Sequence, residues 1–341
     1  MYKTIRVEEA VGQVLAHDVT EIRKGEFKGP AFRKGHIIRP ADVCHLQRLG
    51  KRHVYVLEPE PGHLHEDDAV MALAAAFCGD GVYGSGEPRE GKLHLRAQRD
   101  GLFTVDVDAL YRVNLLGEVM CASRHTHSLV KKEAVVAATR AIPLLVPAST
   151  VEAAVAIARA AGGLFRVNPL RKANVGLVIT GSEVFSRLIE DQFEPVVRQK
   201  IDAIGSEIIG VALAPDDAAA IRSEILKLLA AGADLLLTTG GLSVDPDDVT
   251  RLGIQQAGGE IRFYGAPVLP GAMFLLAYIG KVPVLGLPAC GIYHEATIFD
   301  LILPRVLAGE NLTRRDLARM GHGGLCLHCS ACRYPVCPFG R

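Results

Sequence analysis

Three Gly-rich or Pro-rich stretches follow apolar runs in the second half of the chain. Their residue types are the ones in this sequence best suited to binding a ligand. The first reads Thr-Gly-Ser-Glu at 180–183, the second spans 238–250, and the third reads Gly-Leu-Pro-Ala-Cys-Gly at 286–291. Gly240 and Gly241 lack a Cβ, so the backbone can approach a ligand closely and direct amides at an anion. These stretches therefore predict loops that contact a small ligand.

The side chains of these loops add hydroxyls and carboxylates. Hydroxyls come from Ser182, Thr239 and Ser243. Asp247 and Asp248 offer oxygen ligands for Mg²⁺, and Thr250 is placed to cap the next helix. The set predicts a site for a phosphorylated or otherwise anionic small molecule with an optional divalent metal. The alternative is that the glycines only make tight turns and that Asp248 caps a helix.

Four of the eight cysteines lie within the last 16 residues, at Cys326, Cys329, Cys332 and Cys337. Their spacing is close to that of a bacterial iron–sulfur run, and Zn²⁺ with four thiolates is an equal alternative, in which His322 or His328 could replace a thiolate. A disordered or disulfide-scrambled tail is the other interpretation. Because residues 321–341 contain few aliphatic side chains, we expect a metal to be needed for folding.

Two other groups carry weaker signals. His125 and His127 would point to one face if they lay on a strand, but with no third ligand nearby a solvated loop is expected. Cys290, in the third loop, is expected to line the site as a small apolar residue.

The composition is that of a globular protein of two or three domains. The chain has 341 residues, of which 49% are hydrophobic and 22% charged. Basic and acidic residues number 38 each, so no overall field favours nucleic acid or an anionic membrane. No apolar run reaches the ~18 residues of a spanning helix, and the N-terminus lacks the apolar core of a secretory signal. A cytoplasmic location is therefore expected.

The chain is predicted to have four parts. An α+β segment occupies 1–60 and is followed by a β-rich module with a connecting helix at 61–172. An α/β domain occupies 173–312, and the Cys-rich tail occupies 313–341. A linker is expected at 58–62, where two prolines and a glycine cannot continue a helix or a strand.

The α/β domain is predicted from alternating elements. Strands are expected at 175–180, 207–213, 234–239 and 282–287, and helices at 195–205, 217–229, 250–257 and 293–308. Near-continuous apolar strands separated by helices favour a mainly parallel sheet covered on both faces, a three-layer α/β/α domain. The three loops then follow strand ends at one sheet edge, where α/β folds bind ligands.

Five motifs in order across about 135 residues resemble the molybdopterin-binding domain of molybdenum-cofactor biosynthesis proteins. They are Thr-Gly-Ser-Glu at 180–183, Ala-Pro-Asp-Asp at 214–217, Thr-Gly-Gly-Leu-Ser at 239–243 with Asp248, Pro270-Gly271, and Gly-Leu-Pro at 286–288. The N-terminal run 8–19, with 35–38 and Leu49-Gly50, is similar to elements of the molybdopterin molybdotransferases.

The resemblance implies binding of molybdopterin or its adenylylated form, with molybdate insertion coupled to Mg²⁺-dependent release of AMP. It assigns cofactor binding to Thr180, Gly181, Ser182, Thr239, Gly240, Gly241, Ser243, Pro270, Gly271, Gly286 and Pro288. It makes Glu183, Asp247 and Asp248 the candidate catalytic carboxylates. Expected partners are the pterin, molybdate, a client molybdoenzyme and further copies of the same chain.

Departures from the family pattern leave other functions open. Ser182 replaces an acid, Asp245 replaces a glycine, and the stretches 270–273 and 288–291 lack the family's Lys and Asn. The lost Lys weakens anion binding, and the lost Asn removes a bidentate hydrogen-bonding group. A non-catalytic carrier of the molybdenum cofactor is therefore one alternative. A nucleotide pyrophosphatase of the competence/damage-inducible type is another, because 242–250 also resembles those proteins.

Overall fold

The computed structural model describes residues 2–23, 26–57, 61–89, 91–243, 245 and 248–340. The chain forms two compact units. The first comprises Met1–Arg124 and Val130–Val167, and the second comprises His125–Leu129 and Asn168–Arg341. Within the described ranges, no helix combines the length and the apolar character needed to cross a membrane.

Up to residue 168 the chain is rich in β-strands, as predicted. The elements in chain order are β1 (Tyr2–Arg6), η1 (Val7–Glu9), β2 (Val19–Arg23), β3 (Phe27–Phe32), α1 (Pro40–Arg48), β4 (His53–Leu57), β5 (His63–His65), α2 (Glu66–Phe77), β6 (Val82–Arg89), β7 (Lys92–Ala97), β8 (Gly101–Val105), α3 (Val107–Asn114), β9 (Val119–Ser123), β10 (Ser128–Val130), β11 (Val135–Ala141), β12 (Leu145–Pro147), α4 (Ala148–Ala160) and β13 (Phe165–Asn168).

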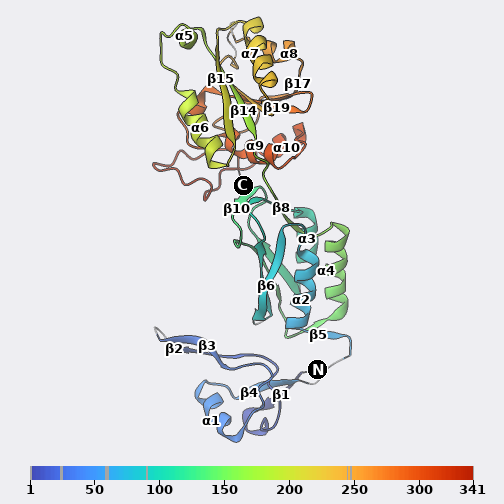
Figure 1. Cartoon of the computed structure of the whole chain (residues 1–341). Helices are drawn as coiled ribbons and strands as arrows, with labels where there is room; N and C mark the ends of the chain where they lie inside the picture. Colours follow the sequence, from blue (N-terminus) through green and yellow to red (C-terminus); the bar gives the residue numbers. More distant parts are fainter. Residues whose placement is uncertain are drawn as a thin grey trace. The chain divides into compact units, whose positions relative to one another are not determined.

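A four-stranded antiparallel sheet of order β6-β7-β11-β9 organises the larger part of the first unit. Helices α2, α3 and α4 pack together beside it (Figure 1). Phe103 and Phe165 stack in its core with ring centroids 5.8 Å apart. The N-terminal part has its own apolar cluster, which includes Val7, Leu15 and Leu46.

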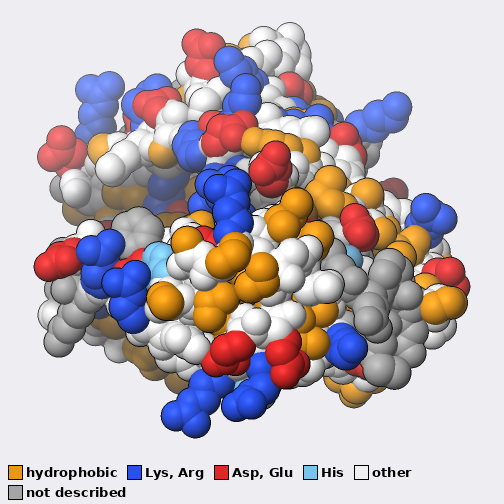
Figure 2. All heavy atoms as spheres, turned by 90° about the horizontal axis from the view of Figure 1, so that it is seen from below, with side chains coloured by type: hydrophobic (Ala, Val, Ile, Leu, Met, Phe, Trp, Pro, Cys, Tyr) orange, Lys and Arg blue, Asp and Glu red, His pale blue; other side chains and the backbone are white. Residues whose placement is uncertain are grey.

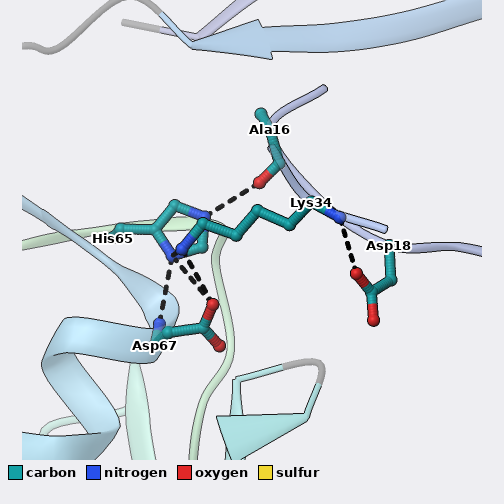
Figure 3. A network of polar contacts seen from close by, with 5 residues as sticks. All are labelled: Ala16, Asp18, Lys34, His65 and Asp67. Atoms are coloured by element: carbon teal, nitrogen blue, oxygen red, sulfur yellow. Dashed lines mark hydrogen bonds and ion pairs between the residues drawn. The ribbon is translucent and has the colours of Figure 1, made fainter. Parts of the chain in front are cut away.

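A network of polar contacts links Lys34 to the start of α2 (Figure 3). The Lys34 ammonium donates to His65 Nδ1 and to Asp67 Oδ2, each at 2.8 Å, and its backbone N–H donates to Asp18 Oδ1 at 2.7 Å. His65 Nε2 lies 2.9 Å from the carbonyl oxygen of Ala16. Because Nδ1 accepts, the ring proton belongs on Nε2, which donates to that carbonyl.

Figure 2 shows side chains of both charges on one face of the molecule. On the face shown in Figure 2, acidic and basic side chains lie interspersed around a largely apolar and uncharged centre. This distribution agrees with the equal totals of 38 basic and 38 acidic residues.

The second unit is an α/β domain, as predicted. Its elements are β14 (Asn174–Thr180), α5 (Ser182–Phe185), α6 (Phe193–Ala203), β15 (Glu207–Ala214), α7 (Ala218–Ala230), β16 (Leu235–Thr239), α8 (Thr250–Gln256), β17 (Gly259–Tyr264), β18 (Leu275–Ile279), β19 (Val282–Leu287), η2 (Ala289–Ile292), α9 (Ile298–Leu307) and α10 (Arg314–Arg319).

One six-stranded sheet of order β15-β14-β16-β19-β18-β17 forms the middle layer of this unit. The first four strands are parallel, and β18 and β17 are antiparallel to their neighbours. Residues of α6 and α9 share one core cluster with the sheet, and residues of α7 and α8 share the other, so helices cover both faces (Figure 1). The strands β17 and β18 were not predicted, because Pro and Gly residues interrupt the apolar run that contains β18.

The Cys-rich tail is anchored on this unit. Phe339 is 3% exposed in the core shared with α9, and the Tyr334 hydroxyl donates to the carbonyl of Asp300 at 3.2 Å. The Cys326 N–H donates to the carbonyl of Leu269 at 2.8 Å. An aromatic side chain and backbone hydrogen bonds therefore order the tail, a contribution that a count of aliphatic residues overlooked.

Candidate functional site

A cavity of about 610 Å³ lies where β16 and β19 end at the same edge of the sheet. Seven of the predicted site residues line it: Gly240, Gly241, Ser243, Asp248, Pro270, Gly271 and Pro288. The second loop, the segment 269–273 and the third loop are thus brought around one hollow. Cys290 also lines it, as expected for a small apolar residue of the third loop.

Glycine is required at both positions of the pair in the second loop. The backbone φ is 80° at Gly240 and 55° at Gly241, a region that other residues rarely adopt. A Cβ on Gly240 would lie 2.3 Å from the carbonyl oxygen of Thr180, and one on Gly241 would lie 2.3 Å from Thr250 Oγ1. The glycines let this loop lie directly against β14 and α8.

Three threonines support the second loop from behind the cavity. Thr180 Oγ1 donates to the carbonyl of Thr239 at 2.9 Å and lies 3.1 Å from Thr250 Oγ1, which donates to the carbonyl of Gly240 at 3.1 Å. All three side chains are buried, and Thr239 Oγ1 has no hydrogen-bond partner among the described residues. Thr180 and Thr239, both predicted to bind the cofactor, therefore lie beneath the loop and not on the cavity wall.

Gly286 also lies outside the cavity lining. A Cβ at this position would lie 2.8 Å from Leu242 Cδ1 and 3.0 Å from the Cβ of Leu275. This glycine therefore allows the second loop to pack over β19.

After Thr180, the first loop turns away from the cavity. Gly181, Ser182 and Glu183 do not line the cavity. The Ser182 N–H donates to Asp216 Oδ2 at 2.8 Å, and the Asp216 N–H donates back to Ser182 Oγ at 3.2 Å. Ser182 therefore joins the loop after β14 to the loop after β15. It is also the first residue of the short α5, and the exposed Glu183 lies in the first turn of that helix.

Among the described residues that line the cavity, Asp248 is the acidic one. Its Oδ2 accepts from the Asp245 N–H at 2.9 Å, which closes the turn before α8. The N-cap of α8 is Val249 and receives no side-chain hydrogen bond, so the capping roles expected for Asp248 and Thr250 are wrong. Asp247 lies outside the described residues.

The cavity wall carries little fixed positive charge. No Lys or Arg is among its described lining residues, which agrees with the loss of the family's Lys in 270–273.

The pKa of the Cys290 thiol is raised above its usual value. Burial raises this pKa, and a backbone hydrogen bond opposes the effect by lowering it. On the outer side of the second loop, the Tyr264 hydroxyl donates to the carbonyl of Leu242 at 2.5 Å.

The sequence analysis missed two residues of the wall, Leu325 and His328, which the tail contributes. Leu325 pairs with Leu269 in an isolated parallel bridge. The sequence offered His328 only as a metal ligand, and no local pattern indicated that the tail folds back over the cavity.

The geometry of the described residues does not support the metal predictions. All four cysteines of the tail are free thiols. Across the described part of the chain, no group of three or more His, Cys, Asp or Glu side chains is arranged to hold a metal ion. A carboxylate and a phosphate can share Mg²⁺ without such a group, because this ion is usually held by one or two carboxylates together with substrate phosphates.

His127 lies in a turn and is an exposed residue, as predicted for a loop. Its imidazole is partly covered, with 33% of the side chain exposed, and its Nε2 lies 3.5 Å from Glu310 Oε1.

Comparison with known proteins places this site in a family. Residues 176–308 match the family described as "Probable molybdopterin binding domain", and residues 4–58 match one described as "Domain of unknown function (DUF8806)". The chain is 26% identical over 151 residues to a molybdopterin molybdenumtransferase of Haemophilus influenzae, a match that covers 42% of this chain and 37% of that protein.

Two further similarities involve shorter or more distant matches. A CinA-like protein of Mycobacterium sp. (strain MCS) is 33% identical over 78 residues, 23% of this chain and 18% of that protein. The molybdopterin biosynthesis enzyme MoaB of Thermus thermophilus has 18% identity and a TM-score of 0.32, covering 40% of this chain and 98% of that one. The chain spans less than half the length of the two curated relatives. Residues 176–308 form a domain of the molybdopterin-binding family.

Proposed function

We propose that this protein binds molybdopterin or its adenylylated form in the cavity at the ends of β16 and β19 and takes part in the insertion of molybdate. One observation carries the proposal: the cavity gathers Gly240, Gly241, Pro270, Gly271 and Pro288, which lie in three separate motifs of the molybdopterin-binding domain. The backbone of the glycine pair receives the phosphate end of the ligand, since no described Lys or Arg lines the wall.

Magnesium belongs to the same proposal. Asp248 would hold the ion through a carboxylate oxygen, because it lines the cavity and the turn engages its Oδ2, and phosphates of the ligand would share the ion with it. Bound Mg²⁺ would neutralise charge on the phosphates. Asp248 itself closes the turn before α8.

The experiment is anaerobic incubation of the full chain with adenylylated molybdopterin, molybdate and Mg²⁺, followed by measurement of AMP. AMP release above that of a boiled control supports the transferase function, and Asp248→Asn is expected to lower the rate at least tenfold at a given Mg²⁺ concentration. Ligand binding without AMP release at any Mg²⁺ concentration contradicts turnover.

A non-catalytic carrier of the cofactor is the second candidate. It is favoured by the position of Ser182, whose hydroxyl and N–H are both engaged with Asp216 outside the cavity. The carrier predicts tight binding with the nucleotide unchanged. Ser182→Asp raises turnover only if the rest of the catalytic site is intact, so it separates a dormant enzyme from a carrier.

A nucleotide pyrophosphatase is the third candidate, because a CinA-like protein shares 33% identity over 78 residues. Nucleotide sugars and adenylylated compounds, screened for phosphate-bond cleavage, test it. We also propose that the protein interacts with a client molybdoenzyme, associates with further copies of itself and is located in the cytoplasm. The Cys-rich tail is proposed to hold a metal.

A further inference from the structure

A second cavity, of about 220 Å³, lies in the same unit and is lined by all four cysteines of the tail. Besides Cys326, Cys329, Cys332 and Cys337, its wall includes the imidazoles of His294 and His328. His328 lines both this cavity and the pterin cavity. The two cavities are therefore neighbours that share one side chain.

The cysteine segment is a loop whose ends are fixed. The Cys326 N–H donates to the carbonyl of Leu269 at 2.8 Å, and the Gly340 N–H donates to the carbonyl of Gly323 at 2.9 Å. Phe339 anchors the far end in the core. Between these anchors Tyr334 and Cys337 pack against the core, whereas Cys329 and Cys332 are exposed. The segment that carries Cys329 and Cys332 is therefore the part of the loop that can adjust when a ligand binds.

The two imidazoles approach one another across the cavity. The ring centroids of His294 and His328 lie 5.2 Å apart, with an angle of 52° between the planes. His328 adopts a φ of 49°, which is uncommon outside glycine and is often associated with functional sites. His294 follows the third loop, so the ligand-binding edge of the sheet and the tail each contribute one ring.

The donors of this cavity suit a thiophilic metal. Thiolates and imidazoles are the ligands of structural zinc and of iron–sulfur clusters. Two cysteines of the first unit have a different environment, since burial raises the pKa of Cys78 to about 11 and raises that of Cys121 as well. Cys78 and Cys121 are therefore inert core thiols.

We propose that the tail cavity binds a thiolate-coordinated metal centre, and that the metal fixes His328, the tail side chain that lines both this cavity and the pterin cavity. Among the described residues the donors line the cavity without three of them converging on one point. Binding must therefore draw the loop inward, and His328, which lines both cavities, moves with it. The effect on the pterin cavity rests on the function proposed above, whereas metal binding does not.

The metal site is tested first, on the full chain and without pterin. Zinc and iron are measured in protein purified anaerobically, and apoprotein is titrated with Co²⁺ as a spectroscopic probe for zinc. Zinc near one atom per chain, or iron with acid-labile sulfide, distinguishes the two kinds of centre. Thiolate-to-cobalt charge-transfer absorption that saturates supports coordination by the cysteines.

A matched pair of variants locates the metal. The double variant Cys329→Ser/Cys332→Ser removes two exposed thiols of the tail, and Cys44→Ser removes an exposed thiol of the first unit. The double variant should bind Co²⁺ at least tenfold more weakly, and Cys44→Ser should bind it like the parent chain. Equal Co²⁺ binding by all three proteins, or no zinc, iron or cobalt binding by the parent chain, overturns the metal site.

The coupling is tested by measuring molybdopterin affinity for metal-loaded and metal-free protein. We expect the dissociation constant to rise at least fivefold when the metal is removed, at the lower end of typical coupling between two sites. An unchanged dissociation constant overturns the coupling. Failure of both forms to bind the pterin refutes the proposed function instead, while the metal content still decides the tail site.

Discussion

The hydroxyl of Thr250 donates a hydrogen bond of 3.1 Å to the carbonyl of Gly240. Thr250 is the first residue of α8, and Gly240 directly follows β16. The bond therefore fixes the glycine loop from the helix that comes after it. Because a Cβ on Gly241 would lie 2.3 Å from the same hydroxyl, the contact also requires glycine in the loop.

Thr250→Val is expected to destabilise the protein and to weaken ligand binding. Valine keeps the shape of threonine but leaves the part-buried carbonyl of Gly240 without this donor. Loss of such a bond costs about 1–2 kcal/mol of unfolding free energy. Urea unfolding measures the first effect and equilibrium pterin binding the second.

The control for Thr250→Val is Thr139→Val in the first unit. Thr139 is also fully buried, and its hydroxyl donates to the carbonyl of Met120 at 3.0 Å. It should cost a similar amount of stability and leave pterin affinity unchanged. Equal losses of pterin affinity in the two variants would show that the effect on binding is merely one of stability.

Gly241→Ala is expected to lower the thermal stability of the protein more than an alanine substitution at another glycine with a positive φ. The added Cβ meets both a positive φ and the Thr250 hydroxyl. Gly232→Ala is the matched control, since Gly232 has a φ of 96° but nothing within 4 Å of an added Cβ. Thermal unfolding should show a larger loss for Gly241→Ala. A loss equal to that of Gly232→Ala would contradict the close packing of the loop.

Cys290 is expected to be protected from alkylation by the pterin. Burial raises the pKa of its thiol, so little reactive thiolate is present near pH 7 and labelling is slow even without ligand. Because Cys290 lines the cavity, a bound pterin should slow labelling further. Iodoacetamide labelling with peptide mass spectrometry measures both rates, and Cys44 serves as the exposed internal control. Identical Cys290 rates with and without pterin would place the ligand elsewhere.

His127 is expected to make stability fall in mildly acidic solution. Burial of the imidazole lowers its pKa below the ordinary 6.5, assisted by Arg305 and opposed by the Glu310 and Asp316 carboxylates. The folded protein thus binds this proton more weakly than the unfolded chain. The stability contribution is complete above about pH 6.5 and is lost as the pH falls through that value toward the lower folded pKa.

The pH effect is measured by urea unfolding at about pH 7.5 and about pH 5.5. His127→Gln should reduce the difference between the two midpoints. His125→Gln, at an exposed neighbouring position, should leave it as in the parent chain. A His127→Gln protein with the full pH dependence would assign the effect to another group.

Much of the α/β fold could be predicted because short stretches of the sequence specify its strands, helices and turns. Apolar runs, helix periods and Gly-rich turns predicted β14, β16 and β19 and the loop that carries Gly240 and Gly241. Residues that follow parallel strands must share one sheet edge, so the cavity could be expected at the ends of β16 and β19. The antiparallel strands β17 and β18 were missed, because their pairing depends on contacts that no single stretch encodes.

The remaining parts of the site depend on packing between distant segments. Thr180 has the appearance of a ligand contact in the sequence, yet its hydroxyl supports the second loop from beneath. Ser182 pairs with Asp216, 34 residues away, and so leaves the cavity. His328 joins the wall because the Cys326 N–H bonds to Leu269 and carries the tail across the domain. Such contacts follow from the tertiary structure alone.

Equilibrium binding of molybdopterin to the full chain under anaerobic conditions tests the central claim most directly, with Gly240→Ala/Gly241→Ala as the loop variant and Gly232→Ala as its control. We predict one pterin per chain for the parent and the control, and at least tenfold weaker binding by the loop variant. Equal binding by all three proteins, or no binding by the parent chain, would contradict a pterin site built on the glycine loop.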